Sequence, residues 1–375
     1  MGRRRVVGVA IDIAWPGKHH QATVRGVLEA ARERGWRCLL DPFLDRLRDV
    51  DGVIARAGRD VADRVRRARI PTVNVWVNSP DRSLPRVVPD QAAAGRLAAD
   101  HLKARGFRRF GFLGHPRDLN TELYGSAFRE RLESEGFPCT VRKILQEPRS
   151  AAQWRSVQAA LDAWISEWIP PCGIFVADDF TARLLADACR RRGLRLPDDA
   201  ALVGLGNEEL TCEMMMPSLT SIEMGFERVG RGAVEMLDRL LRGRTTPRPV
   251  LVPPAGVVER ASTDVFAVDD REVARALRAI AELSGRPVRV PMVVEAVQGA
   301  RRSLERRFRK SLGRTIHEEI QRAHVERAKR LLASTDEPLK RVARDAGFRS
   351  PQQLSKRFRR LEGTTPLAFR RRHRP

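Results

Sequence analysis

Two stretches near the carboxyl end of the chain carry basic side chains at a spacing that fits contact with DNA. Pro291–Gly299 is followed by Ala300–Lys310, and Pro338–Gly347 is followed by Phe348–Arg360. In both, the residues predict a short apolar helix, a turn marked by glycine and a longer basic helix. A short helix packed across a longer basic one is the arrangement that presents a helix to the DNA major groove.

The repetition of this plan is what carries the prediction. Leu304 and Phe308 lie four residues apart, as do Leu354 and Phe358. Residues at that spacing share one helix face, so we expect these side chains to point inward and the Lys and Arg side chains to stay outside. An ordinary helical bundle with a solvated basic surface is the alternative, but it does not explain why the plan occurs twice.

The positive charge of the chain is concentrated in the same region. The whole sequence has 70 Lys and Arg against 47 Asp and Glu, a net charge of +23. Residues 271–375 hold 28 basic and 11 acidic residues (net +17), and residues 1–270 hold the other 42 and 36 (net +6). Such a concentration favours contact with DNA phosphates, which supply affinity but not sequence choice. An anionic membrane surface is the runner-up partner. A membrane partner would favour one basic amphipathic helix with bulky aromatic residues, whereas this sequence predicts two compact units. No membrane partner is therefore expected.

Signatures of common enzyme classes are incomplete in this chain. Gly204–Glu209 lacks the third glycine of a dinucleotide-binding loop, and Gly17–His19 has histidine where a phosphate loop has Ser or Thr. His317–Gln321 lacks the second histidine of a zinc-protease helix. No cluster of Cys, His or Asp completes a metal site around His19 and His20. We therefore expect no catalytic residue, no metal and no cofactor.

The amino terminus predicts neither a secretion signal nor a membrane span. Its apolar run breaks at Asp12, no small-residue cleavage site follows, and no stretch reaches the roughly 18 apolar residues of a span. The expected location is the cytoplasm. Reduced thiols fit that location, because the cysteines are scattered without a CxxC pair, at Cys38, Cys139, Cys172, Cys189 and Cys212.

The first 265 residues alternate apolar runs with amphipathic stretches. Val6–Ile13 is typical of a parallel strand buried on both faces, and residues 19–34 after it predict a helix. Repeated strand–helix units predict open parallel sheets, and the length allows two of them. We therefore predict an α/β part with two Rossmann-like lobes and a ligand cleft at the carboxyl ends of the strands. Further strands are predicted at 36–40, 51–55, 71–75, 109–114, 173–176, 200–206 and 249–252, and further helices near 60–68, 91–105, 121–135, 151–167, 180–192 and 226–241.

The polar segment Asp264–Asp270 predicts the boundary between this α/β part and an all-α part. The sensing part is expected to span residues 1–265, and the DNA-binding part residues 268–375. Asp269 or Asp270 is predicted to cap a helix over residues 271–283.

The carboxy-terminal residues resemble the DNA-binding domain of the arabinose-regulator (AraC/XylS) family. The resemblance rests on Gly347-Phe348, Leu354, Phe358, Gly363–Arg370 and the linker helix Glu326–Leu332. The amino-terminal part resembles the periplasmic-binding-protein-like domain of the lactose and galactose repressors. The matching runs are Gly95–Leu102, Gly106-Phe107, Phe110–Gly114, Gly173–Asp179, Val203–Asn207 and Pro217–Ile222.

The two parts in this order resemble the xylose-operon regulator family. That resemblance implies a sugar-responsive activator that binds double-stranded DNA as a homodimer, with RNA polymerase as a further partner. It places outward positions of the two recognition helices on Arg301, Arg302, Glu305 and Arg306, and on Gln352 and Lys356. Arg suits guanine, Gln suits adenine and Glu can accept from cytosine. The two helices are expected in major-groove segments about 34 Å apart.

The ligand cleft implied by the resemblance departs from the pentose and hexose pattern. Tyr124 stands where such pockets have arginine, and Gly206, followed by Asn207, stands where they have aspartate. Asp178 matches a polar position at a strand end, and Trp15 is placed either to stack on a sugar ring or to pack at the rim. The predicted ligand-binding residues are Trp15, His19, His20, Tyr124, Asp178, Gly206 and Asn207.

These departures remove the groups that usually clamp sugar hydroxyls. We therefore expect free xylose or arabinose to bind weakly or not at all, and a ligand with an apolar or aromatic face to be favoured. A cleft that has lost its ligand and serves only as a dimerisation scaffold is the alternative.

Together these features predict a sequence-specific transcription regulator with a small-molecule-sensing domain, and not an enzyme. Ligand would bias the lobes toward closure and reorient the DNA-binding domains, which requires different affinities for the two states. A DNA-modifying or repair enzyme that uses the same helices for targeting is the alternative from another class. A reactive cysteine or a metal cluster would have favoured it. A non-specific packaging protein is disfavoured by the large, nearly neutral α/β part.

Overall fold

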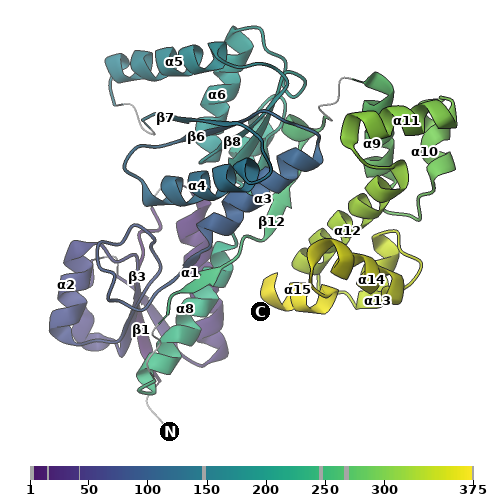
Figure 1. Ribbon diagram of the computed structural model, residues 1–375. Helices are drawn as coiled ribbons and strands as arrows, with labels where there is room; N and C mark the ends of the chain where they lie inside the picture. Colours follow the sequence, from purple (N-terminus) through teal and green to yellow (C-terminus); the bar gives the residue numbers. More distant parts are fainter. Residues whose placement is uncertain are drawn as a thin grey trace.

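A computed structural model describes residues 4–14, 17–41, 43–145, 149–244, 248–265 and 270–373 of the chain. The amino-terminal part forms two α/β lobes, and the carboxy-terminal part is made of helices (Figure 1). The predicted fold class is confirmed. None of the helices formed by the described residues combines the length and hydropathy that a membrane crossing requires.

The first lobe is built on a four-stranded parallel sheet in the order β2-β1-β3-β4. Its central strands are apolar and buried because helices cover the sheet. The strands are β1 (Val6–Ala10), β2 (Arg37–Leu40), β3 (Gly52–Ala55) and β4 (Thr72–Asn74), and the helices are α1 (Lys18–Glu33), η1 (Leu47–Asp49), α2 (Arg59–Ala68) and α8 (Phe226–Leu241).

Two glycines let α1 and α8 cross closely in this lobe. A Cβ atom added at Gly26 would lie 2.0 Å from the carbonyl oxygen of Glu227, and one at Gly230 would lie 2.1 Å from that of Thr23. Any larger side chain would therefore push the helices apart. The helix α1, whose first turn holds His19 and His20, is thereby packed closely against α8.

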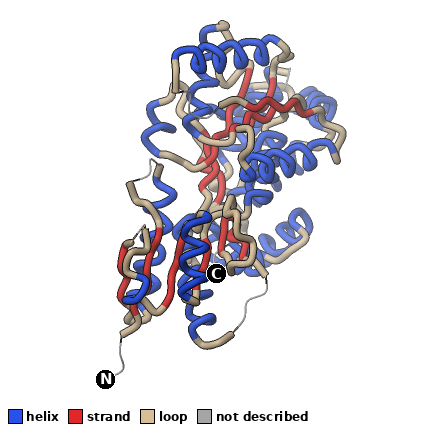
Figure 2. Tube along the Cα trace, turned by 90° about the vertical axis from the view of Figure 1, so that its left-hand side faces the viewer, coloured by secondary structure: helices blue, strands red, loops and turns tan. Residues whose placement is uncertain are grey.

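The second lobe is built on a six-stranded sheet in the order β12-β10-β9-β8-β6-β7. Figure 2 shows the two lobes one above the other, with the strands enclosed by helices. The strands are β6 (Phe110–Gly114), β7 (Cys139–Lys143), β8 (Cys172–Val176), β9 (Ala200–Leu205), β10 (Thr220–Glu223) and β12 (Gly256–Val258), and the helices are α3 (Gln91–Ala104), α4 (Leu119–Glu133), α5 (Ala151–Ser166), α6 (Asp179–Arg191), α7 (Glu209–Met214) and η2 (Ala261–Thr263).

The predicted strands and helices are present, with ends shifted by a few residues, but the sheets are more varied than expected. β12 runs antiparallel to β10, whereas the other paired strands are parallel. β5 (Val87–Pro89) and β11 (Val250–Val252) form a separate two-stranded parallel sheet. The unpredicted strands β5, β7, β10 and β12 are short or partly exposed, so they lack the long apolar run that reveals a central strand.

The helical part contains two separate cores that share one long helix. Leu304 and Phe308 pack in the first core, Leu354 and Phe358 pack in the second, and all four are fully buried as predicted. The long helix α12 contributes one end to each core. The helices are α9 (Arg271–Leu283), α10 (Val290–Val297), α11 (Arg301–Leu312), α12 (Ile316–Ser334), α13 (Leu339–Asp345), α14 (Pro351–Glu362) and α15 (Pro366–His373).

The turns of the two units differ from the prediction in one respect. Gly347 has a left-handed φ of +77° in the second unit, and a Cβ there would lie 2.6 Å from the carbonyl oxygen of Arg286. In the first unit the left-handed residue is Gln298, with φ of +56°, and not Gly299. Asp270 caps α9 by accepting hydrogen bonds from two backbone amides, as predicted, and Asp269 lies outside the described residues.

Candidate DNA interface and ligand cleft

The helix α11 presents the predicted DNA-contact residues of the first unit on its outer face. Arg301, Arg302 and Arg306 are exposed, and Glu305 is half-buried. These four residues line an open hollow of about 860 Å³. Its other lining residues are Val290, Arg309, Lys310, Thr315, Ile316 and His317. The hollow is cationic, since it combines five Arg or Lys side chains with one carboxylate.

Glu305 has a cationic partner within its own helix. The Nε of Arg301 donates to Oε1 of Glu305 at 2.9 Å, one helical turn away. The side chain of Arg301 is 61% exposed and that of Glu305 is 43% exposed, so solvent screens the pair and it contributes little stability. Arg302 and Arg306 lie on the same outer face.

The helix α14 presents the predicted residues of the second unit in the same way. Gln352 and Lys356 are exposed, and Leu354 between them is buried. The helix begins at Ser350, whose Oγ accepts a hydrogen bond from the backbone amide of Gln353 at 3.2 Å. The structure therefore leaves the predicted outward side chains of both recognition helices open to solvent.

The predicted ligand residues lie where strands of the sensing part end. Asp178 follows β8, and Gly206 and Asn207 follow the neighbouring strand β9. His19 and His20 lie in the first turn of α1, which follows β1 of the other lobe. Trp15 lies outside the described residues.

Contacts join the two lobes at this edge. The Nζ of Lys18 donates to Oε2 of Glu223 at 2.6 Å, and the backbone amide of Lys18 donates to Glu208 at 2.8 Å. Asn78 of the first lobe donates to Asp118 of the second at 2.7 Å. The predicted residues thus lie near the edge where the two lobes meet, and hydrogen bonds already join the lobes there.

Asp178 is held by structural hydrogen bonds. Its side chain accepts from the backbone amide of Thr181 at 2.7 Å and so caps α6, and it pairs with Nε2 of His115 at 2.6 Å. Burial alone would raise the pKa of Asp178, but the hydrogen bond and the charge of His115 hold it below its ordinary value. Burial lowers the pKa of His115, and Asp178 outweighs that effect and raises it. The partners of the two ring nitrogens, Asp178 at Nε2 and the carbonyl oxygen of Ile144 at Nδ1, both favour the protonated imidazole.

Asn207 connects an acidic residue to an arginine at the same edge. Its Nδ2 donates to Oε2 of Glu223 at 3.2 Å, and its Oδ1 accepts from Arg260 at 2.9 Å. Gly206 has φ of +116°, a conformation that aspartate rarely adopts. The backbone conformation at position 206 therefore suits glycine and not the expected aspartate. Glu223 of the neighbouring strand β10 supplies a carboxylate instead.

Tyr124 does not stand open to the cleft in this state. Its side chain is 7% exposed and its ring meets that of Phe175 edge-on, with centroids 6.3 Å apart. Burial, together with the charges of Asp118 and Asp178, raises the pKa of Tyr124 well above its ordinary value. The phenol therefore stays neutral and lies near both acidic residues.

The two histidines of α1 are packed against each other. Their ring centroids are 4.4 Å apart, and Nδ1 of His20 lies 2.6 Å from the carbonyl oxygen of Asp12. Burial, the neighbouring His20 and the charge of Arg56 lower the pKa of His19 to about 4. His19 is therefore a neutral hydrogen-bonding group. Within the described ranges, no group of three His, Cys, Asp or Glu side chains is arranged to hold a metal ion.

Several polar residues of the cleft were not predicted from the sequence. They lie at the ends of strands or in the first turn of a helix, which was the available signal. Arg56 follows β3 and stacks over the ring of Trp76 at 4.0 Å, and Asp118 caps α4. The unpredicted residues are Lys18, Arg56, Trp76, Asn78, His115, Asp118, Glu208, Glu223 and Arg260.

Models of two protein families match the chain. The periplasmic binding protein-like domain matches residues 99–263, and the helix-turn-helix domain matches residues 293–372. The first match covers strands and helices of the second lobe, and the second match covers both helix-turn-helix units from Val293 onward.

Transcription regulators are similar to this chain over most of its length. The xylose operon regulatory protein of Haemophilus influenzae is 30% identical over 332 residues, which cover 86% of this chain and 85% of that protein. The protein of the same name from Escherichia coli is 31% identical over 288 residues, 76% of this chain and 73% of that protein. The solved structure of a xylose-binding transcription activator aligns with a TM-score of 0.63 at 27% identity and covers 98% of both chains.

Proposed function

Because the chain belongs to the family of the xylose operon regulatory proteins and is a DNA-binding transcription regulator rather than an enzyme, we propose that the cleft between its lobes binds a sugar or a sugar derivative that controls the DNA-binding helices. The observation that carries the DNA-binding role is the paired arrangement of α11 and α14, each with a buried Leu/Phe pair and exposed polar side chains. We propose the cytoplasm as its place of action, because its partner there is double-stranded DNA.

The proposed DNA contacts are the exposed polar residues of the two recognition helices. In α11 they are Arg301, Arg302, Glu305 and Arg306, and in α14 they are Gln352 and Lys356. Arginine can pair with both acceptors of guanine, and glutamine can pair with adenine in the same manner. The remaining basic residues around the hollow suit contact with phosphates, which orient the protein without selecting a sequence.

The proposed ligand contacts are polar groups from both lobes. His19 and His20 belong to the first lobe, and Tyr124, Asp178, Gly206 and Asn207 belong to the second. The cross-lobe pairs Lys18–Glu223 and Asn78–Asp118 support a cleft that closes around its ligand. A few convergent polar groups on an otherwise apolar wall are what small-molecule sites need.

The nature of the ligand follows from the residues that stand in for the usual sugar clamps. The arginine of the pentose and hexose pattern is replaced by the buried Tyr124, so we propose weak or absent binding of free xylose and arabinose. The carboxylate of Glu223 is engaged with Lys18 and Asn207, and the ring of Trp76 lies under Arg56. A ligand whose apolar or aromatic face could take the place of Arg56 on the ring of Trp76, such as a glycoside or a modified sugar, is favoured.

A thermal-shift screen of the full chain over sugars, sugar acids and glycosides tests this proposal. A ligand at 100 times its dissociation constant stabilises the folded state by about 2.7 kcal/mol. A shift with a glycoside or sugar acid and none with xylose is the expected result. A clear shift with xylose would refute the altered cleft.

A cleft that serves only as a scaffold is the second candidate. The pairs Asp178–His115, Lys18–Glu223 and Asn78–Asp118 favour it, since they satisfy these polar groups without a ligand. Absence of any thermal shift across the whole panel would select this candidate.

We also propose a homodimer assembled through the sensing part, with RNA polymerase as the further partner. The proposed division of the chain is residues 1–265 for sensing and residues 268–375 for DNA binding. Residues 268–375 alone should bind an operator half-site more weakly than the full chain does, because a dimer links two sites. Equal affinities of fragment and full chain in a gel-shift titration would remove the case for dimerisation through the sensing part.

A further inference from the structure

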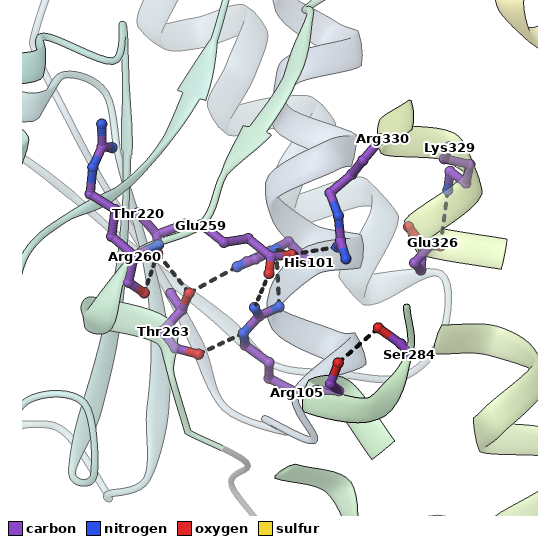
Figure 3. Close-up of polar contacts among 11 residues, drawn as sticks. His101, Arg105, Thr220, Glu259, Arg260, Thr263, Ser284, Glu326, Lys329 and Arg330 are labelled. Carbon is purple, nitrogen blue, oxygen red and sulfur yellow. Dashed lines mark hydrogen bonds and ion pairs between the residues drawn. The ribbon is translucent and has the colours of Figure 1, made fainter. Parts of the chain in front are cut away.

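A polar cluster lies where the second lobe meets the linker helix of the DNA-binding part. Figure 1 shows α12 beside α3 and β12, and Figure 3 shows side chains from these elements pointing toward one another. The cluster consists of His101 of α3, Arg105 directly after α3, Thr220 of β10, Glu259 and Arg260 after β12, Thr263 of η2 and Arg330 of α12.

Glu259 connects the two parts of the molecule. Its Oε1 accepts from Nη1 of Arg330 at 2.8 Å, and its Oε2 lies 3.3 Å from Nη2 of Arg105 (Figure 3). Arg105 is itself held by the carbonyl oxygen of Thr263, which accepts from its Nε at 2.6 Å. The carboxylate of Glu259 is thus set by the sensing part and presented to the DNA-binding part.

The hydrogen bonds behind Glu259 run in a definite direction. An Nη1 of arginine can only donate, so Nδ1 of His101, 3.1 Å away, must accept. Burial, with the charges of Arg105 and Arg330, lowers the pKa of His101 well below its ordinary value, so the ring is neutral. Its proton therefore lies on Nε2 and is donated to Oγ1 of Thr263 at 3.1 Å.

The same chain of hydrogen bonds continues to the backbone of Arg260. Oγ1 of Thr263 lies 2.8 Å from Oγ1 of Thr220, which donates to the carbonyl oxygen of Arg260 and accepts from its amide. Thr220 and Thr263 are fully buried. A buried network with every member satisfied holds its elements in one arrangement. These bonds tie the backbone of Arg260 to the side chain of Thr263 and so hold the segment 259–263 in one conformation.

Arg260 points from this segment toward the ligand cleft. Its Nη2 donates to Oδ1 of Asn207 at 2.9 Å, and Nη1 donates to the carbonyl oxygen of Leu219 at 3.0 Å. Neighbouring residues of an extended segment point to opposite sides, so Glu259 and Arg260 reach different parts of the molecule. One side chain contacts the DNA-binding part and the next contacts the cleft.

The connection extends from Asn207 to the other lobe. Asn207 donates to Oε2 of Glu223, and the same oxygen accepts from Nζ of Lys18 in the first lobe. Movement of one lobe relative to the other, or a ligand that takes over the amide of Asn207, must change this set of bonds.

We infer that Glu259 and Arg260 couple the cleft to the DNA-binding part: the bonds at Asn207 set the position of Arg260, and Glu259 in turn holds or releases α12 through Arg330. This inference rests on the proposed function of the cleft as a ligand site, and it names the residues through which that site regulates DNA binding. Arg260, Glu259 and Arg330 are positioning residues in this scheme.

The strength of the contact suits a switch. The side chains of Glu259 and Arg330 are 37% and 43% exposed, so solvent weakens their attraction and the pair shifts the docking equilibrium by no more than about fivefold. A second contact between the two parts joins Arg108 to the carbonyl oxygen of Ser311 at 3.4 Å. Because these contacts contribute only a small free energy of docking, a ligand that prefers one arrangement of the cleft can shift the docking equilibrium.

Hydrogen–deuterium exchange of the full chain, measured without ligand or DNA, tests the coupling. The exchange rate of a helix amide follows the population of opened states, so release of α12 should raise exchange between residues 324 and 332. We expect Arg330→Ala to raise it about threefold and Asn207→Gly, which touches only the cleft end, to raise it by a similar factor. Glycine is chosen because Asn207 has φ of +51°.

The double variant separates coupling from two local effects. If the contacts act in series, the α12 amides of the double variant Asn207→Gly/Arg330→Ala exchange no faster than those of Arg330→Ala alone. Arg260→Ala is a second way to cut the same chain and should match Asn207→Gly. Arg195→Ala is the matched control, because it removes an exposed arginine of the same lobe whose ion pair with Asp199 is local.

The two possible results have opposite meanings. Unchanged exchange of α12 in both cleft-side variants, or effects that simply multiply in the double variant, would overturn the coupling. The measurement needs no ligand, so it is independent of the thermal-shift screen. If a compound of the panel gives a thermal shift but α12 exchange is unchanged in the cleft-side variants, the proposed function stands and this inference fails. If α12 exchange responds to the cleft-side variants but no compound gives a shift, the coupling stands and the proposed ligand binding fails.

Discussion

The two helix-turn-helix units bury the same side chains at the same positions but are held by different polar contacts. Leu304 and Phe308 of the first unit and Leu354 and Phe358 of the second are fully buried. Each pair belongs to a core of its own, and α12 is the element that the two cores share. The apolar spacing is therefore enough to fold each unit, and the difference between them lies elsewhere.

In the first unit, an arginine of the recognition helix forms ion pairs with the beginning of α9. Arg307 of α11 pairs with Asp270 and Glu272 at the beginning of α9, at 2.5 and 2.9 Å. Its recognition helix begins at Ala300, which supplies no side-chain cap. The second recognition helix begins at Ser350, which does, and Glu362 at its end pairs with Lys329 of α12.

This contrast separates two roles. The first unit presents the cationic hollow, and the second unit shares with the sensing part the stretch of α12 that holds Lys329 and Arg330. Apolar patterning builds both units alike, and the charged residues around them distinguish the unit with the cationic hollow from the unit that packs beside Lys329 and Arg330 of α12.

The largest expected effect tests whether the two cores are independent. Phe308→Ala and Phe358→Ala should each cost about 3–5 kcal/mol of unfolding free energy, because each removes a fully buried aromatic ring. Each should loosen only its own unit, since the rings lie in separate cores. Native-state hydrogen exchange reports the two units separately. Equal loss of protection in both units from either substitution would show that they fold as one.

The next effect distinguishes sequence reading from phosphate contact in the first unit. Arg306→Ala should weaken operator binding by about 1–3 kcal/mol and relax the preference at one base pair. Gln352→Ala should do the same at a different base pair for the second unit. Binding to a library of operator variants measures both. Arg344→Ala, an exposed arginine of α13 paired with its neighbour Asp345, is the control. Uniform weakening on all sequences would make Arg306 a phosphate contact.

Substitutions at the N-caps of the two recognition helices should change the free energy of unfolding by smaller amounts and in opposite directions. Ser350→Ala should destabilise the second unit by about 1 kcal/mol, because the amide of Gln353 loses its acceptor. Ala300→Ser should stabilise the first unit by a similar amount, since Ala300 already has the extended backbone of an N-cap. Urea denaturation of the full chain measures both. A loss of stability on Ala300→Ser would mean that the first unit cannot accept the cap of the second.

The smallest expected difference is in the titration of the anchoring carboxylates. Burial alone raises the pKa of Asp270, but Arg307 and two backbone amides hold it below the ordinary 3.8. Burial raises the pKa of Glu362 above the ordinary 4.5, and Lys329 does not outweigh it. Asp270 therefore contributes stability above pH 3.8 that is lost as the pH falls through its lower folded pKa. Ionisation of Glu362 costs stability as the pH rises from 4.5 through its higher folded pKa.

Carboxyl carbon NMR of the full chain measures these two titrations directly. Asp270 should titrate below 3.8 and Glu362 above 4.5. Arg307→Gln should move Asp270 upward and leave Glu362 unchanged, because the two groups belong to different units. Shifts of the same sign for both carboxylates would contradict the difference in anchoring.

Much of the fold could be read from local pattern. Strands such as Gly52–Ala55 and Phe110–Gly114 are buried along their whole length, and a run of apolar residues reveals them. Leu354 and Phe358 were placed on the buried face of their helix by spacing alone. The short strand Gly256–Val258 was missed, because three half-buried residues carry no period.

The sequence by itself determined the class of this protein: apolar spacing fixes which face of each helix is buried, and the concentration of charge in residues 271–375 indicates which part meets DNA. Only the tertiary structure decided that Glu223 supplies a carboxylate beside Asn207, and that Glu259 contacts Arg330 across 71 positions of the chain. The physical reason is that periodicity records the direction of a side chain relative to its own element. The partner that it meets depends on how distant elements pack, and a carboxylate looks the same in the sequence whether it faces solvent, a cleft or another domain.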